Sequence, residues 1–464
     1  MILSRDGFKI KKKDIDLKII KKIREDLTVK PFVYNDYNNT SNEKRFTLYL
    51  ESPKKLYLPR FYGIDLLGDN YINKIDEGDY IDLKFNGSLR KEQLPIADLY
   101  TNSAKKNGGG IISLKCGGGK TVLALYIISL LKKKTVVVVH KDFLMTQWRE
   151  RIEQFLPDAK IGKIQQNTVD IEGKDIVLAM VQSLSMKEYP DDTFNSFGFA
   201  VFDECHHLGA EVFSKAMPKV ASKYMLGLSA TPNRKDGLRK VFEWYIGPMV
   251  YISKDKDDGY VEVNILSYIS DNLNYCKEEK TVRGDPCIPR MINNICDFED
   301  RNLFIYNKIK EFYNIGRKIL ILTDRRNHIL NLLNKIQKEL CNVGLYVGGM
   351  KPEELKESQN RDIILGTFSM ASEGMDVPKL NTVILASPKS DVEQSVGRIF
   401  REKAENRKFH PLIIDIQDNF SLFQKQSDKR LKLYKKNKYD IFMNGEKYIK
   451  KNKKKLNFDE CLIK

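Results

Sequence analysis

The fold is decided by residues 114–121, whose sequence is LKCGGGKT. The short apolar run at residues 110–114 predicts a buried strand, and residues 122–131, rich in Leu, Ile and Ala, predict a helix. A glycine run between strand and helix that ends in Gly-Lys-Thr is typical of a phosphate-binding loop. Because glycine lacks a Cβ, successive backbone N–H groups can turn toward one phosphate. The residues expected to hold a nucleotide here are Cys116, Gly117, Gly118, Gly119, Lys120 and Thr121.

Two side chains of this loop have specific expected roles. Lys120 is placed to reach the β- and γ-phosphates, and the Thr121 hydroxyl is placed to hold Mg²⁺. The longer form of the pattern has glycine where this chain has Leu114, so the match is to the shorter form G-x-G-K-T. The alternative interpretation is a glycine-rich turn beside a solvated lysine.

Composition sets the class of protein. A chain of 464 residues predicts roughly two to four domains. The net charge of +17 favours a polyanionic partner such as nucleic acid, although a lysine-rich, AT-biased genome would produce the same excess. The seven cysteines are scattered, which argues against a disulfide framework or a zinc module. With no signal-peptide core and no apolar run of membrane-spanning length, we expect a soluble, intracellular protein without a membrane partner.

The pattern of elements predicts an α/β protein. Apolar strands alternate with helices, which favours mostly parallel sheets with helices on both faces. Residues 249–300 are polar and turn-rich. The expected strands are 135–139, 175–181, 199–202 and 224–228, then 319–322, 362–365, 382–385 and 412–416. The expected domains are an α+β accessory domain (1–84), a first α/β lobe (85–250), a second (251–424) and a basic tail (425–464).

A pair of acids follows the apolar strand at 199–202. Asp203 is placed to bind Mg²⁺, directly or through water, and Glu204 to polarise an attacking water as general base. Two adjacent acids at a buried strand end are costly unless a cation or a pKa shift relieves them. The residues that follow, Cys205, His206 and His207, do not have the spacing of a four-ligand zinc site.

The order of motifs resembles that of superfamily 2 helicases and translocases. The glycine loop is followed by the sequences DECH (203–206) and SATP (229–232). In the second half, ILILTD (319–324), GT (366–367), SEGMDVP (372–378) and QSVGRIFR (394–401) look like further motifs of that superfamily. The resemblance covers roughly residues 85–402. It implies two tandem RecA-like lobes that bind ATP and Mg²⁺ and act on nucleic acid.

The resemblance also implies roles for individual residues. Arg398 and Arg401 lie three apart, so on a helix they share one face and can meet growing charge on a γ-phosphate. The family pattern makes Arg401 the stronger arginine finger and Arg398 a γ-phosphate contact. Gln93, in the sequence LRKEQ (89–93), matches the glutamine that binds adenine. The remaining residues implied at the ATP site are Gln394, Gly374 and Asp376.

Nucleic acid is expected to cross the tops of both lobes. Hydroxyl, amide and backbone N–H groups there can contact phosphates without reading sequence. The candidates from the resemblance are His140, Lys141, Gln147, Gln182, Ser183, Thr323, Arg325, Gly366 and Thr367. Trp148 is expected in the core rather than as a base-stacking platform.

One position favours a branch of the superfamily. RNA helicases usually carry arginine after the residue that opens the sixth motif, and here that position is Ser395. The chain looks more like the DNA-directed, XPB-like branch. The accessory domain (1–84) resembles the N-terminal part of helicases of large DNA viruses, of the poxvirus transcript-release type. We expect a monomeric motor on duplex DNA in viral transcription, replication or repair. Its expected partners are RNA polymerase or other transcription or replication proteins, in host cytoplasm, viral factory or virion. The alternatives are an RNA helicase or transcript-release factor, a translocase that does not unwind, and a nucleic-acid-binding scaffold.

Overall fold

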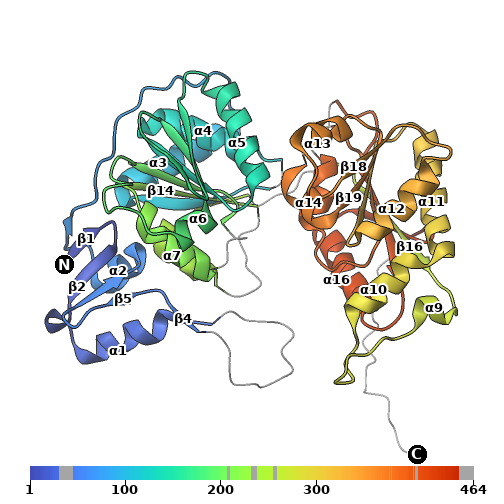
Figure 1. Ribbon diagram of the computed structural model, residues 1–464, viewed down its shortest axis with the longest axis horizontal. Helices are drawn as coiled ribbons and strands as arrows, with labels where there is room; N and C mark the ends of the chain where they lie inside the picture. The colour runs from blue at the N-terminus through green and yellow to red at the C-terminus, as the bar shows by residue number, and fades with distance from the viewer. Residues whose placement is uncertain are drawn as a thin grey trace, which may run out of the picture. The chain divides into compact units, whose positions relative to one another are not determined.

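The computed structural model divides the chain into two compact units, Met1–Asp255 and Lys256–Lys464 (Figure 1). The structure describes residues 1–30, 45–115, 117–205, 210–230, 238–253, 259–375, 377, 379–400, 402 and 406–448. Among these residues, the helices are too short or too polar to cross a membrane.

The first lobe is built on an eight-stranded sheet in the order β11-β10-β12-β9-β13-β14-β8-β15. Neighbouring strands are parallel, except that β10 and β11 pair antiparallel. The strands are β8 (Gly109–Ser113), β9 (Thr135–Val139), β10 (Ile161–Gln165), β11 (Thr168–Asp170), β12 (Ile176–Met180), β13 (Phe199–Phe202), β14 (Tyr224–Ser229) and β15 (Met249–Ile252).

Helices cover both faces of this sheet, as the sequence predicts. Along β9, Val136 and Val138 face one core cluster, whereas Val137 and Val139 face the other. One face is covered by α3 (Gln93–Asn107), α4 (Lys120–Leu131) and α5 (Asp142–Phe155). The other face is covered by α6 (Val181–Met186), α7 (Ala210–Val220) and α8 (Arg239–Ile246) (Figure 1). A strand buried on both faces explains the continuous valines of β9.

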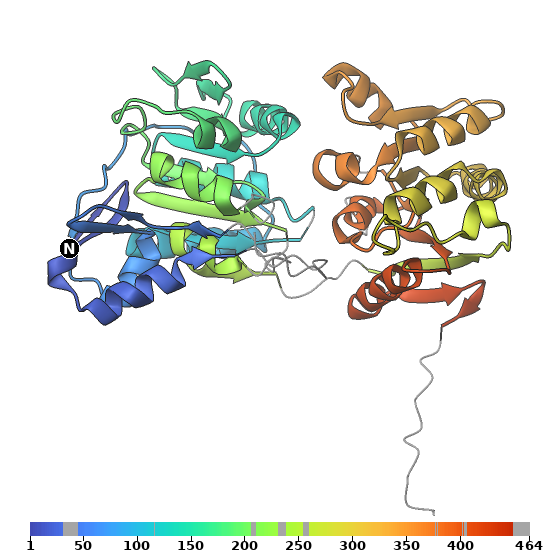
Figure 2. The ribbon, with the colours of Figure 1, turned by 60° about the horizontal axis from the view of Figure 1, so that its bottom comes forward.

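The N-terminal segment has its own five-stranded sheet, in the order β5-β6-β2-β1-β7. Its elements are β1 (Ile2–Ser4), β2 (Gly7–Lys11), α1 (Leu17–Asp26), β3 (Thr28–Val29), β4 (Phe46–Thr47), β5 (Leu50–Glu51), β6 (Lys55–Leu58), α2 (Arg60–Leu67) and β7 (Ile72–Asn73). The side chains of Leu3, Phe8 and Leu56 belong to the same core cluster as α7 and α8 of the first lobe. The segment therefore packs against that side of the lobe (Figure 2).

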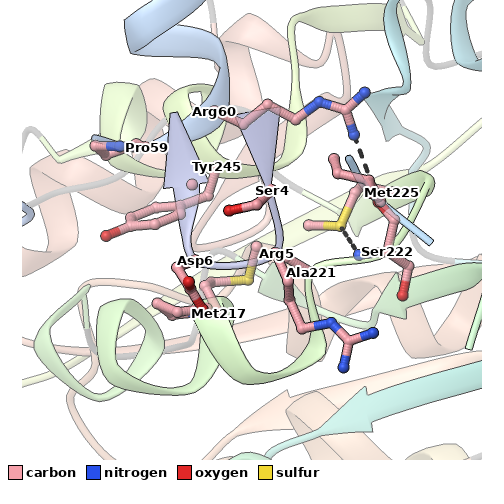
Figure 3. Close-up of a pocket in the computed structure, with 13 residues that line it drawn as sticks. Ser4, Arg5, Asp6, Pro59, Arg60, Met217, Ala221, Ser222, Met225 and Tyr245 are labelled. Atoms are coloured by element: carbon pink, nitrogen blue, oxygen red, sulfur yellow. Dashed lines mark hydrogen bonds between the residues drawn. The ribbon is translucent and has the colours of Figure 1, made fainter. Parts of the chain in front are cut away.

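Arg60 of α2 fixes this junction. Its guanidinium donates to the carbonyl oxygens of Asn107 (3.3 Å), Lys223 (3.1 Å) and Ser222 (3.4 Å). Burial lowers the pKa of Arg60 to about 10. A pocket beside it is lined by residues of β1, α2, α7 and α8, among them Ser4 and Tyr245 (Figure 3). The carbonyl at the end of α3 is among the acceptors, so the cation lies at the end of a helix where negative charge accumulates.

The second lobe repeats the architecture with a sheet in the order β18-β19-β17-β20-β21-β16-β22-β23. Its strands are parallel, except for the pair β22–β23. They are β16 (Glu262–Tyr268), β17 (Ile319–Thr323), β18 (Val343–Tyr346), β19 (Ile363–Thr367), β20 (Thr382–Leu385), β21 (Leu412–Asp418), β22 (Asp440–Met443) and β23 (Glu446–Lys447).

Two groups of helices cover the second sheet. On one face lie α11 (Glu299–Asn314) and α12 (Arg326–Ile336). On the other lie α14 (Phe368–Gly374), α15 (Glu393–Val396), the 3-10 helix η3 (Gly397–Phe400) and α16 (Phe423–Lys436). The short helices α9 (Leu273–Cys276) and α10 (Ile288–Asp297) form a smaller cluster with Phe423. The helix α13 (Pro352–Gln359) follows β18.

Two segments contain more structure than their composition predicts. Residues 249–300, read as polar and turn-rich, contribute β15, β16 and α10. The segment from residue 425, expected either as a solvated basic tail or as a helix with a basic arm, contributes most of α16 and the strand β22, which pairs with β16. Tyr434 in α16 is fully buried. The exposed lysines of α16 dominate its composition, so composition alone does not indicate that one side of this helix is buried. Residues 449–464 lie outside the described part.

Candidate active site

The glycine loop lies between β8 and the first turn of α4, where the sequence predicts it. Gly117 and Gly119 have φ angles of +76° and +74°, in the left-handed region. A Cβ on Gly119 would lie 2.5 Å from Gln93 Nε2, and one on Gly118 would lie 2.9 Å from the carbonyl oxygen of Lys115. Side chains are therefore excluded at Gly118 and Gly119, and helix α4 begins at Lys120 with its backbone N–H groups directed toward the loop.

The side chain of Gln93 forms hydrogen bonds with the backbone of this loop. Its side chain is buried, and Nε2 donates to the carbonyl oxygens of Gly118 (3.0 Å) and Gly119 (3.3 Å). Its Oε1 accepts from Arg90 N at 3.0 Å, while Arg90 Nη1 donates to the carbonyl oxygen of Gly117 at 3.2 Å. The sequence reading proposed Gln93 for adenine and did not find this contact with the loop. The adenine role stays a prediction.

The predicted acids meet the predicted lysine. Although β14 lies between β8 and β13, Lys120 Nζ is 2.8 Å from Glu204 Oε1. The backbone N–H of Glu204 donates to Asp203 Oδ1 at 2.9 Å. Glu204 has a φ of +45°, which a residue with a Cβ adopts at a cost of about 1–3 kcal/mol. Such strain is concentrated at functional sites, so the turn after β13 is held in place by its surroundings.

Burial dominates the electrostatics of Asp203. The residue is only 5% exposed, and burial raises the pKa of its carboxyl to about 6, with a further contribution from the charge of Glu204. Lys120 and a hydrogen bond from Trp148 act in the opposite direction. The raised pKa means that the surroundings compensate this negative charge incompletely.

Trp148 supplies a contact that sequence reasoning missed. Its Nε1 donates to Asp203 Oδ2 at 2.8 Å, and the side chain is 1% exposed. The prediction that Trp148 lies in the core is confirmed, because it belongs to the cluster beneath α4 and α5. A signal was available: a buried indole N–H usually finds an acceptor, and Asp203 follows a neighbouring strand.

The second lobe places its predicted residues around α15 and η3. Arg398 lies in η3, is 6% exposed, and donates through Nη1 to the carbonyl oxygen of Met375 at 3.0 Å. Gln394 lies in α15 and is partly exposed. Gly374 is the last residue of α14. The predictions for Cys116, Asp376 and Arg401 fall outside the described residues, as do those that involve His206 and His207.

Of the nucleic-acid candidates in the first lobe, most reach the surface. Gln182 is exposed, and its Nε2 donates to the carbonyl oxygen of His140 at 3.0 Å, which joins the ends of β9 and β12. His140, Lys141 and Gln147 are partly exposed. Ser183 differs: it is 8% exposed, and its hydroxyl accepts from Gln166 N at 2.9 Å. The Ser183 hydroxyl therefore faces the protein, and a contact between Ser183 and nucleic acid stays a prediction.

The candidates of the second lobe differ in their exposure. Thr323 is fully buried, and its hydroxyl lies 2.9 Å from His328 Nδ1, so it is not placed to meet a phosphate. Arg325 is partly exposed and donates through Nε to Asn293 Oδ1 at 2.6 Å. Gly366 is buried in β19, and the Thr367 hydroxyl accepts from Met370 N at 3.4 Å as the N-cap of α14. A motif gives residue types, whereas the direction of each side chain depends on neighbouring elements.

A glycine loop at the head of a helix, with a lysine that meets acids at the end of a parallel strand, defines the class of phosphate-loop ATPases. The comparisons with known proteins give the family. Residues 86–234 match the family model described as type III restriction enzyme, res subunit, and residues 305–403 match the helicase conserved C-terminal domain.

Two relatives match the chain over different lengths. A putative ATP-dependent RNA helicase of Acanthamoeba polyphaga mimivirus is 40% identical over 450 residues, which cover 95% of this chain and 86% of the relative. A DNA 3′-5′ translocase, XPB2, of Sulfurisphaera tokodaii is 36% identical over 166 residues, which cover 35% of this chain and 37% of the relative.

A solved structure agrees in fold. It is a fragment of a putative HsdR subunit of a type I restriction enzyme from Vibrio vulnificus, with a TM-score of 0.53 and 20% identity, covering 79% of this chain and 71% of that one. The chain therefore belongs to the superfamily 2 helicases and groups with those of large DNA viruses; it is an ATP-dependent, nucleic-acid-binding enzyme of that family.

Proposed function

We propose that this protein is a DNA-directed motor that couples hydrolysis of ATP to movement along, or unwinding of, duplex DNA. The observation that carries the ATPase part is the contact between Lys120 and Glu204 beside the buried Asp203. The DNA part is supported by Ser395 at the position where RNA helicases usually carry arginine, and by similarity to a relative named as a DNA translocase.

The residues present suit a magnesium nucleotide. Backbone N–H groups of the glycine loop and Lys120 would hold the phosphates, and the oxygens of Thr121 and Asp203 would hold Mg²⁺, which prefers hard oxygen ligands. Within the described ranges, three or more His, Cys, Asp or Glu residues nowhere gather into a possible metal site.

Each remaining residue has a proposed task. Glu204 takes the proton of the attacking water, and Arg398 and Arg401 of the second lobe stabilise the charge that grows on the transferred phosphoryl group. From the family resemblance, Gln93, Gly374, Asp376 and Gln394 are further proposed nucleotide contacts. The proposed strand contacts are His140, Lys141, Gln147, Gln182, Arg325, Gly366 and Thr367. Alternating contacts of the two lobes during hydrolysis would then move the motor.

The substrate is tested by measuring ATPase rates with duplex DNA, single-stranded DNA, RNA or no nucleic acid, with a strand-displacement assay beside them. We expect the largest stimulation with duplex DNA. Displacement of a strand separates a helicase from a translocase that does not unwind. An ATPase rate that is the same under all four conditions would contradict the proposal of a motor, because coupling requires that nucleic acid changes the rate of ATP hydrolysis.

The catalytic assignment is tested with Glu204→Gln. We expect the turnover number to fall about 10²- to 10⁴-fold with ATP binding retained, because the amide keeps the shape but cannot accept the proton. Glu211→Gln is the matched control: Glu211 is exposed on α7 and pairs with Lys215 at 2.9 Å. Normal hydrolysis by Glu204→Gln would remove the base assignment.

A second candidate function is an RNA helicase or a factor that releases transcripts. It is favoured by the name of the mimivirus relative, an ATP-dependent RNA helicase. Stimulation by RNA alone in the assay above would select it. For either function we propose a monomer that works with RNA polymerase or other transcription or replication proteins, in host cytoplasm, viral factory or virion.

A further inference from the structure

We propose that Trp148 is a positioning residue for the metal site: its indole N–H holds the Asp203 carboxylate in the orientation that receives nucleotide-bound Mg²⁺. This inference rests on the proposed function, because it assumes that the glycine loop binds a magnesium nucleotide.

The geometry fixes both oxygens of the carboxylate. Trp148 Nε1 reaches Asp203 Oδ2 at 2.8 Å, and the backbone N–H of Glu204 reaches Oδ1 at 2.9 Å. One donor comes from helix α5 and the other from the turn after β13, so rotation of the carboxylate would break at least one bond. Each oxygen accepts more than one hydrogen bond, so a second acceptor position remains on each for a metal ion or its water.

The nature of the donors matters as much as their positions. Both are neutral N–H groups, so they orient Asp203 without cancelling its charge. A guanidinium in the same place would hold the carboxylate equally well but would compete with a cation. The lysine of the loop reaches the neighbouring acid instead, with Lys120 Nζ 2.8 Å from Glu204 Oε1. The Asp203 carboxylate thus keeps its negative charge in a buried position, where it can bind a divalent ion.

The competing interpretation is that Trp148 only fills space. Its large side chain is 1% exposed and packs in the cluster beneath α4 and α5. Substitution by Phe separates the two roles, because Phe retains most of the apolar volume but has no N–H. The chain has two tryptophans, and Trp244 provides the matched control. Trp244 packs edge-on against Tyr62 at 5.2 Å between ring centres, on the other side of the sheet.

The experiment measures the dissociation constant of a fluorescent ADP analogue, mant-ADP, with Mg²⁺ and with EDTA. For Trp148→Phe we expect an unchanged constant in EDTA and an about tenfold higher Mg²⁺ concentration for half-maximal tightening, as is typical when the partner of a metal ligand is removed. Trp244→Phe should behave as wild type. Equal Mg²⁺ dependence in Trp148→Phe and wild type would overturn the proposal, as would weaker binding in EDTA by the same factor as in Mg²⁺.

A second measurement covers the case in which Trp148→Phe does not fold. In Trp244→Phe, Trp148 is the only tryptophan, and adding Mg²⁺ to the ADP-bound protein should change its emission, because the ion alters the field at the acceptor of the indole N–H. An emission that does not respond would overturn the proposal. If wild type binds no nucleotide under any condition, the proposed function itself fails, which is a different result.

Discussion

The two sheets of this chain bury aspartates on or just after central strands, but they satisfy them with different partners. In the first lobe, Asp203 follows β13 and accepts hydrogen bonds from the N–H groups of Trp148 and Glu204. In the second lobe, Asp418 ends β21, is fully buried, and accepts two hydrogen bonds from Arg301 at 2.7 and 2.9 Å. Tyr275 donates a third at 2.8 Å.

A second aspartate of β21 follows the same pattern. Asp415 is fully buried and bonded to the guanidinium of Arg430, while the hydroxyl of Tyr434 donates to it at 2.9 Å. A bidentate guanidinium with a phenol satisfies both the charge and the lone pairs of a carboxylate. Asp415 and Asp418 thus anchor α16 and α11 to the sheet.

If Asp203 binds Mg²⁺ as proposed, the difference distinguishes a metal-binding carboxylate from a structural one. Burial does not separate them, since all three aspartates are nearly or fully buried. The partners do: neutral donors leave the charge of Asp203 available for a cation, whereas guanidiniums neutralise the charges of Asp415 and Asp418. Removing a partner should therefore destabilise the second lobe, and removing the charge of Asp203 should stabilise the first.

The largest effect is expected for Arg301→Met. It leaves the charge of Asp418 buried without its cation, which costs about 3–5 kcal/mol of unfolding free energy. Hydrogen exchange of peptides that contain β21 should then lose protection by a matching amount. Arg326→Met is the control, because Arg326 is exposed on α12. Unchanged protection of β21 would show that this ion pair does not hold the second lobe together.

A second large effect is expected from pH. Burial, together with the charge of Arg301, lowers the pKa of His328 to about 3, below the value of about 6.5 that it has when unfolded. As pH falls from 6.5 toward 3, His328 binds a proton in the unfolded chain but not in the folded chain. The free energy of unfolding therefore falls by about 4 kcal/mol over that range.

This loss should be reduced in His328→Gln. Urea unfolding followed by circular dichroism at several pH values between 7 and 4 measures it. His410→Gln is the matched control, since His410 is 38% exposed. An equally steep loss of stability in His328→Gln would assign the acid sensitivity to other groups.

An effect of opposite sign is expected for Asp203→Asn. The folded-state pKa of about 6 lies above the usual value for Asp, so the contribution of this group is present at low pH and is lost as pH rises through 6. At pH 8 the neutral amide removes the buried charge but can accept only one of the two N–H hydrogen bonds, so the free energy of unfolding of the first unit should rise by only about 1 kcal/mol, while hydrolysis is lost.

Tryptophan fluorescence during urea unfolding reports this change, because Trp148 and Trp244 both lie in the first unit. Asp418→Asn provides the contrast and should destabilise the second lobe. If Asp203→Asn destabilises its lobe to the same degree, the distinction between the two kinds of carboxylate does not hold.

The smallest effect is expected for Glu51→Gln at the surface. The hydrogen bonds from Arg24 and Lys12 lower the pKa of Glu51 to about 2, yet its side chain is 25% exposed. The lowered pKa means that the contribution is present above pH about 4.5 and is lost toward pH 2. Solvent screens such pairs, so urea unfolding at pH 7 should show a loss below about 1 kcal/mol. A loss as large as that of Arg301→Met would contradict the role given to burial.

Much of the site could be predicted from local sequence. The position of the glycine loop at the start of α4 and the approach of Lys120 to Glu204 follow from short motifs that fix both backbone shape and residue type, while the roles of these residues stay predictions. The contact between Trp148 and Asp203 could not be found in this way, since it joins residues 55 positions apart. The burial of Thr323 and Ser183 was missed for a related reason: a motif does not say which side of a strand end a hydroxyl faces.

By itself, the sequence determined the two α/β lobes, the glycine loop between strand and helix, and the membership in the helicase superfamily. These follow from the spacing of apolar residues, the positions of glycines and the order of motifs, which can all be read along the chain. Only the tertiary structure decided that α16 belongs to the second lobe, that Gln93 supports the loop, and that Asp203 is held by neutral donors. Those features depend on which distant elements pack together, because burial and hydrogen-bond partners are set by the packed structure as a whole.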